Sequence, residues 1–135
     1  MFTEDEKKVY KGKIPFGNGQ VHSTDRYFIV AQVDEKHCYL LNCSSIRKKR
    51  RKLMFPSNTE LNQCIPPLKE KTMVKMDEIY QVEIDSLNIL QPLPSTLTDS
   101  TYAEFVIDFK EYIEMEHVVD PKIYEYSYED ISACN

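Results

Sequence analysis

Several features that assign a protein to a class are scarce or missing in this sequence. It has three glycines and no tryptophan among 135 residues, and no window approaches the roughly 18 consecutive apolar residues of a membrane-spanning helix. The first ten residues, MFTEDEKKVY, lack the apolar stretch of a signal peptide. We therefore expect a cytoplasmic protein without membrane association.

Motifs of metal centres and of common hydrolases are also missing. The four cysteines form no CxxC pair and have no histidine at ligand spacing. No HExxH, Ser-His-Asp or paired-carboxylate arrangement can be read from the spacing, and the glycine-containing segment lacks the GK[ST] of a P-loop. We expect reduced, mostly buried thiols, no metal and no cofactor. The cysteines are Cys38, Cys43, Cys64 and Cys134.

The residues that are present predict a mainly β fold. The runs YFIVAQV (27–33) and HCYLLNCS (37–44) flank a polar turn, which is typical of a β-hairpin. Shorter strands are expected over 9–14 and 52–55, and two more within 72–84. The segment 57–71 is expected to be irregular, because it contains two consecutive prolines.

One helix is expected near the C-terminus. Apolar residues in the segment 101–116 recur with a period of 3.6 residues, and Thr101 and Glu104 have the spacing of a capping box. The apolar residues are Tyr102, Phe105, Val106, Phe109, Tyr112 and Ile113. Five to six short strands with one C-terminal amphipathic helix predict a small β-barrel with the helix against the sheet. We expect one domain over 1–116, and an acidic tail or extra edge strand over 117–135.

A run of six basic residues stands out in a chain of net charge −5. Without the run, 11 basic residues face 22 acidic ones, and from Asp99 onward there are ten acidic residues and two basic ones. Such a run repels itself unless a partner neutralises it. A nucleic-acid backbone, acidic segments of the same or a neighbouring chain, and a solvated loop or localisation signal all remain open explanations. The run is Arg47, Lys48, Lys49, Arg50, Arg51 and Lys52.

A candidate anion site lies at the open end of the hairpin. Arg26 stands where the glycine-containing loop enters the first strand, and the planar guanidinium suits a phosphate. The partner strand ends in Ser44 and Ser45, which the hairpin brings back towards Arg26. His22 lies in the loop, where it is either a solvent-exposed bystander or a catalytic or phosphate-binding group. An ordinary edge arginine with two turn serines is the alternative.

The order of these features resembles the MazF/PemK family of toxin endoribonucleases, which are small SH3-like barrels of bacterial toxin–antitoxin systems. Three stretches within residues 9–113 carry the resemblance: GQVHSTDRYFIVAQV with Arg26, CYLLNCSSI with Ser44, and TMVKMDEIYQVEIDSL from Thr72. Arg26 falls at the position of the family's catalytic arginine. Tyr27 stands where family members usually carry proline.

The resemblance implies metal-independent cleavage of single-stranded RNA, in which the ribose 2′-hydroxyl attacks the adjacent phosphorus. Arg26 would stabilise the phosphate and Ser44 would donate a hydrogen bond to it. His22 is our own candidate for the proton transfer, because arginine has a usual pKa above about 12. The basic run 47–52, with Ser45 and Tyr27, would bind the RNA backbone and bases.

The resemblance also implies a homodimer and a cognate antitoxin protein as partners. A non-catalytic barrel that binds RNA or an acidic protein partner is the alternative. Charge alone motivates one more hypothesis, that residues 118–135 occupy the RNA groove and hold the protein inactive.

Overall fold

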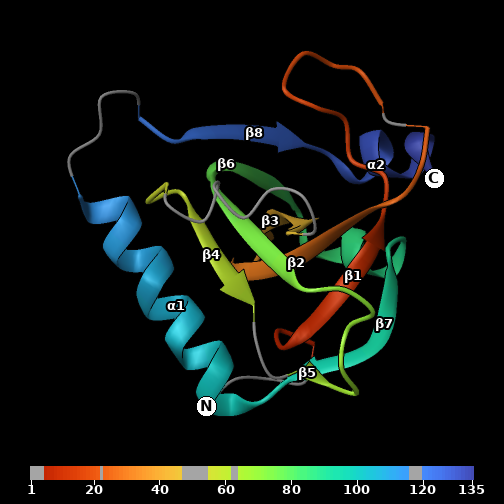
Figure 1. Cartoon of the computed structure of the whole chain (residues 1–135). Helices are drawn as coiled ribbons and strands as arrows, with labels where there is room; N and C mark the ends of the chain where they lie inside the picture. The colour runs from red at the N-terminus through yellow and green to blue at the C-terminus, as the bar shows by residue number, and fades with distance from the viewer. Residues whose placement is uncertain (1–4, 22, 47–54, 62–63, 116–119) are drawn as a thin grey trace.

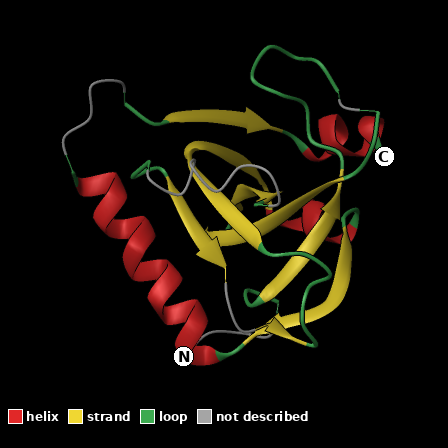
Figure 2. Cartoon of the chain, in the orientation of Figure 1, coloured by secondary structure: helices red, strands yellow, loops and turns green. Residues whose placement is uncertain are grey.

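A computed structural model describes residues 5–21, 23–46, 55–61, 64–115 and 120–135. In this part of the chain, eight strands form one curled sheet, a half-barrel, and two helices lie against it (Figures 1 and 2). The prediction of a mainly β fold is confirmed. The sheet has more strands than the expected five or six, and a second helix accompanies the expected one.

The sheet follows the order β4-β6-β3-β2-β1-β7-β5, with antiparallel neighbours, and β8 pairs with β6 in parallel. The two ends of this path, β4 and β5, are consecutive in the chain. The strands are β1 (Lys8–Gly12), β2 (Arg26–Val33), β3 (His37–Ser45), β4 (Asn58–Leu61), β5 (Cys64–Ile65), β6 (Thr72–Glu83), β7 (Gln91–Leu97) and β8 (Lys122–Tyr126). The helices are η2 (Ile84–Asn88, 3-10), α1 (Asp99–Glu114) and α2 (Tyr128–Cys134).

The hairpin is confirmed as the pair β2–β3. Tyr27 lies opposite Cys43 and Ile29 lies opposite Leu41. The turn closes on Asp34, whose carboxylate accepts hydrogen bonds from the backbone N–H groups of Lys36 at 2.8 Å and His37 at 2.7 Å. These hydrogen bonds hold the pKa of Asp34 below its usual value, and the one from Lys36 has the larger effect.

Both faces of the hairpin are covered, so both alternating sets of side chains are buried. One face, called here the α1 face, packs Ile29, Leu41 and Val74 against Phe105 and Phe109 of α1. The other, called here the C-terminal face, packs a second set against α2 and the aromatic residues of β8. This second set includes Phe28, Val30, Leu40, Tyr80 and Ile131. Consecutive strand residues therefore belong to different cores.

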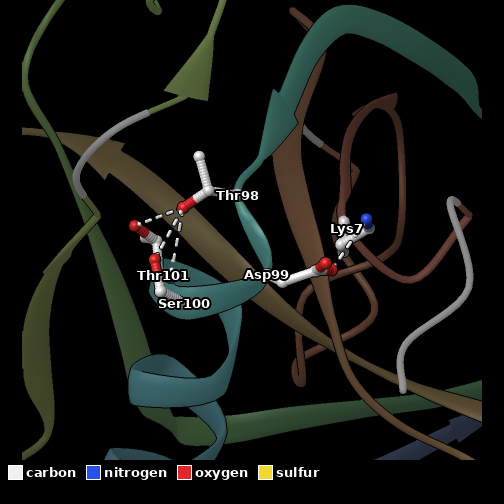
Figure 3. A network of polar contacts seen from close by, with 5 residues as sticks. All are labelled: Lys7, Thr98, Asp99, Ser100 and Thr101. Carbon is white, nitrogen blue, oxygen red and sulfur yellow. Dashed lines mark hydrogen bonds and ion pairs between the residues drawn. The ribbon is translucent and has the colours of Figure 1, made fainter.

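Helix α1 begins earlier than the capping-box spacing indicates. Its N-cap is Thr98, whose side-chain oxygen accepts a hydrogen bond from the backbone N–H of Thr101 at 3.2 Å. Figure 3 shows this cap beside Lys7, whose ammonium lies 2.9 Å from the Asp99 carboxylate in the first turn. The expected box of Thr101 and Glu104 is thus wrong by three residues. Tyr102, Phe105, Phe109 and Tyr112 are buried as expected, whereas Ile113 is exposed.

Several segments differ from the sequence-based expectation. The segment 57–71 contains β4 and β5, and β6 is one continuous strand instead of two. Strand β7 was not expected, because it contains Pro92 and Pro94. Strand β5 pairs only with Thr96 and Leu97 of β7, so in the described part of the chain β7 has one neighbouring strand, β1, at the prolines. Proline has no backbone N–H to donate, and on a strand with one neighbour that N–H is not needed for a second ladder. The segment 52–55 lies outside the described residues except for Phe55.

The C-terminal segment is integrated into the fold. Strand β8 pairs with β6, and α2 buries Ile131 completely in the core of the C-terminal face. The Asn135 side chain joins the segment to Lys13, the residue after β1: it accepts from the Lys13 N–H and donates to the Lys13 carbonyl, both at 2.8 Å. The hypothesis that residues 118–135 occupy an RNA groove and hold the protein inactive stays a prediction.

Candidate functional site

A cleft of about 630 Å³ lies at the open end of the hairpin. Residues of strands β1, β2, β3, β6 and β7 and of the segment 66–70 line it. We call it the Tyr27 cleft, because the Tyr27 ring projects into it and is 46% exposed. Its lining residues are Val9, Lys11, Tyr27, Ser44, Ser45, Pro66, Pro67, Leu68, Lys69, Glu70, Thr72, Leu93, Pro94 and Ser95.

Strand register explains why polar side chains gather in this cleft. Lys11 pairs directly with Tyr27 across β1 and β2, and Ser45 pairs with Thr72 across β3 and β6. Directly opposite residues share a face, with their Cβ atoms about 4.5–5.5 Å apart. All four belong to the α1 face, beyond the point where α1 covers it. A cation, an aromatic ring and two hydroxyls thus line the cleft together.

The segment 66–70, called here the proline wall of the cleft, is held to the sheet by contacts on both sides of it. Ile65 pairs with Thr96 of β7, and the Ile46 N–H donates to the Lys71 carbonyl at 2.9 Å. The Thr72 hydroxyl donates to the Glu70 carbonyl at 3.0 Å. The wall carries a proline pair with Leu68, which give the cleft an apolar side, and Lys69 with Glu70, which give it charge.

Arg26 lies outside this lining, on the C-terminal face. Its guanidinium donates to the Ile14 carbonyl at 2.7 Å, and the guanidinium carbon lies 4.1 Å from the Phe16 ring centroid. The same carbon is 5.0 Å from the Phe28 centroid and 5.3 Å from that of Tyr80. Its Nε atom is buried and has no hydrogen-bond partner in the described part of the chain. The cation is enclosed by aromatic rings.

Tyrosines of β8 complete this enclosure. The Tyr126 ring stacks on Tyr80 with centroids 6.5 Å apart, and its hydroxyl donates to the Phe16 carbonyl at 2.9 Å. Burial raises the pKa of Tyr80 to about 12, although the nearby Arg26 acts in the opposite direction. Arg26 therefore links the glycine-containing loop, the hairpin and the C-terminal segment.

The expected closeness of Arg26 to Ser44 follows from the strand register. The pairing of Tyr27 with Cys43, extended by one residue, sets Arg26 opposite Ser44. Ser44 and Ser45 both contribute to the cleft lining, with Tyr27, whereas the guanidinium of Arg26 points to the aromatic residues of the other face. Tyr27, Ser44 and Ser45 therefore lie together in the cleft, whereas the Arg26 side chain lies on the C-terminal face.

The remaining predicted site residues lie outside the described part of the chain. These are His22 and the basic run, Arg47, Lys48, Lys49, Arg50, Arg51 and Lys52. In sequence, the run begins two residues after Ser45.

Among the described residues, no group of histidine, cysteine and acidic side chains could hold a metal ion. Cys38, Cys43 and Cys64 are buried free thiols, and burial raises the pKa of Cys38 to about 12. Within the same residues, no helix is long and apolar enough to span a membrane.

Sequence reasoning missed Lys11, Lys69, Glu70 and Thr72 as cleft residues. Lys11 shares a face with the buried Val9, and β1 has no clean alternation of apolar and polar residues that would have marked it as a cleft residue. Lys69 and Glu70 follow the proline pair in a segment without periodicity, and only the pairing of β5 with β7 and of β6 with β3 brings them to the hairpin.

Comparisons of this chain with protein-family models, with curated proteins and with solved structures found no match.

Proposed function

We propose that this chain is a toxin-type endoribonuclease, with an SH3-like barrel, that binds single-stranded RNA in the Tyr27 cleft. It cleaves the RNA by metal-independent attack of the ribose 2′-hydroxyl. The observation that carries the proposal is the set of Lys11, Tyr27, Ser45 and Thr72 in one open cleft. A cation, an aromatic ring and hydroxyls are the groups that bind single-stranded RNA without reading a duplex.

Each group has a defined part in binding. The exposed Tyr27 ring stacks on a base. Leu68, Pro66 and Pro67 of the proline wall supply an apolar surface for that base. The Lys11 ammonium neutralises the adjacent phosphate, and the Ser45 hydroxyl donates to one of its oxygens. The basic run 47–52 follows this end of β3 in sequence and extends the contact along the RNA backbone.

The toxin assignment includes a homodimer and a cognate antitoxin protein, both of which follow from the family resemblance. The catalytic role that the resemblance gives to Arg26 stays a prediction. Its aromatic packing favours a structural role, in which it ties the start of β2 to the C-terminal face.

A non-catalytic RNA-binding module is the second candidate function. It is favoured by the engagement of Arg26, since one donor of the guanidinium is bound to Ile14 and another is buried. In this case the cleft binds RNA and leaves it intact.

The test measures binding and cleavage of a long single-stranded RNA in the presence of EDTA. Truncating Tyr27 to alanine should weaken binding by about 1–3 kcal/mol, which is about 5- to 150-fold. Lys11→Ala should lower the slope of log affinity against log salt by about 0.7, the contribution of one phosphate contact to a single strand. Cuts in the wild-type reaction support the nuclease, and retention of intact RNA supports the binding module.

Two matched variants control for general effects of truncation. Tyr128 is 38% exposed at the start of α2, so Tyr128→Ala removes a comparable ring far from the cleft. Lys110→Ala removes an exposed ammonium from α1. Equal losses of affinity in Tyr27→Ala and Tyr128→Ala would refute the assignment of the cleft.

A further inference from the structure

Cleavage by 2′-hydroxyl attack needs a group that accepts the 2′ proton. Among the described residues that line the Tyr27 cleft, Glu70 carries the one carboxylate. Two ammonium groups, those of Lys11 and Lys69, line the same cleft and can bind the phosphate that such a base would act beside. The cleft thus contains both kinds of group that the reaction needs.

The backbone holds Glu70 close to the hydroxyl side of the cleft. Two residues later, Thr72 pairs with Ser45, and the Thr72 hydroxyl donates back to the Glu70 carbonyl at 3.0 Å. Between them, the Lys71 carbonyl accepts from the Ile46 N–H at 2.9 Å. The chain at Glu70 is therefore fixed to the end of β3, and the carboxylate is carried by a stretch with a defined position relative to Ser45.

The arginine at the start of β2 is poorly placed to act as the base. Its guanidinium donates to the Ile14 carbonyl and lies on the opposite face of the sheet from the cleft. An arginine also has a usual pKa above about 12, so it holds its proton at neutral pH. A carboxylate is among the usual general bases of enzymes.

We propose that Glu70 is the general base of the cleavage reaction and that Lys11 stabilises the phosphate. This inference rests on the proposed nuclease function. The Glu70 carboxylate takes the proton of the 2′-hydroxyl, and the 2′-oxygen forms a bond to the adjacent phosphorus. The bond from phosphorus to the 5′-oxygen breaks, and the 5′-oxygen leaves with the electron pair and takes a proton from water. The products are a 2′,3′-cyclic phosphate and a 5′-hydroxyl.

The experiment separates binding from chemistry in Glu70→Gln, which keeps the shape of the side chain and removes the base. Binding is measured with a 2′-O-methyl RNA, which cannot undergo the attack, and the cleavage rate is measured with the unmodified RNA of the same sequence. We expect the cleavage rate to fall about 10²- to 10⁴-fold, the usual contribution of a general base, with little change in affinity. Glu104→Gln, an exposed position on α1, is the matched control and should cleave at the wild-type rate.

The possible results distinguish a failure of the Glu70 assignment from a failure of the proposed nuclease function. If the wild-type protein cleaves and Glu70→Gln cleaves equally fast, Glu70 is not the base and the nuclease function stands. If Glu70→Gln loses affinity together with cleavage, Glu70 contributes to binding and not to proton transfer. If the wild-type protein binds RNA without cutting it, the nuclease function fails, and the inference fails with it. Products without a cyclic phosphate would also overturn the mechanism.

Discussion

Replacement of Arg26 by alanine distinguishes a structural arginine from a catalytic one. The substitution removes a charge-assisted hydrogen bond to the Ile14 carbonyl, which is worth about 1.5–3 kcal/mol. It also removes the cation from the Phe16 ring, where the 4.1 Å distance supports a further contribution of about 0.5–1 kcal/mol. The buried, unpartnered Nε atom offsets part of this sum. The two contributions sum to about 2–4 kcal/mol, and with this offset we expect a net loss towards the lower end of that range.

For a chain of this length, a loss of that size lowers the melting temperature by about 6–20 °C. Thermal unfolding followed by circular dichroism measures it. Arg26→Lys should fall between wild type and alanine, because lysine keeps the charge beside the rings and loses the planar fork. At a temperature where the variants are folded, RNA affinity should stay within about twofold of wild type, since the cleft keeps its cation and its ring.

The opposite pattern would refute this reasoning. An Arg26→Ala protein that melts within about 2 °C of wild type but cleaves RNA at least 100-fold more slowly has lost a catalytic group. In that case the guanidinium acts on the phosphate, as the family resemblance implies, and its aromatic enclosure is not its main role.

Three further predictions concern the two cores. Tyr102→Phe should lose about 1–2 kcal/mol in urea denaturation, because the Val30 carbonyl is left without the hydroxyl that donates to it. Since burial raises the pKa of Tyr80 from 10.0 to about 12, its contribution to stability is complete below pH 10 and is lost as the pH rises towards 12. Melting temperatures measured across this window should fall less steeply in Tyr80→Phe. Gly17→Ala should destabilise by about 1–3 kcal/mol, because the added Cβ would lie 2.2 Å from the Tyr124 ring.

The hairpin and α1 could be predicted from the sequence because their signals are local. Two apolar runs with a polar turn determine β2 and β3, and a 3.6-residue period determines α1. Strand β7 could not be predicted, because its prolines argue against a ladder, and only the short reach of β5 makes them acceptable. Helix α2 has seven residues, too few for a periodic signal, although Ser127 and Asp130 form a capping box that marks its start.

The site could be predicted in part, for a physical reason that lies in β2 itself. Both faces of this strand are buried, so its sequence has no alternation that would reveal which face each residue occupies. The order of residues therefore placed Arg26 and Tyr27 at the open end of the hairpin, on opposite faces of the strand, but could not say which of the two faces carries the cleft. Glu70 was out of reach of sequence reasoning, because its place beside Ser45 depends on a pairing between strands 27 residues apart, Ser45 with Thr72.

The division of β2 into two faces connects the stability of this protein to its proposed function. Arg26 ties the start of the strand to Phe16 and, through Tyr80, to the C-terminal segment, while the next residue, Tyr27, enters the cleft. Loss of the arginine should therefore act on the folded state as a whole, and loss of the tyrosine should act on bound RNA alone. Because each strand residue contacts a different core, the two effects should be separable in the single variants despite their adjacency in sequence. Under the proposed function, the C-terminal segment would support the strand that carries the cleft from the face opposite to the bound RNA.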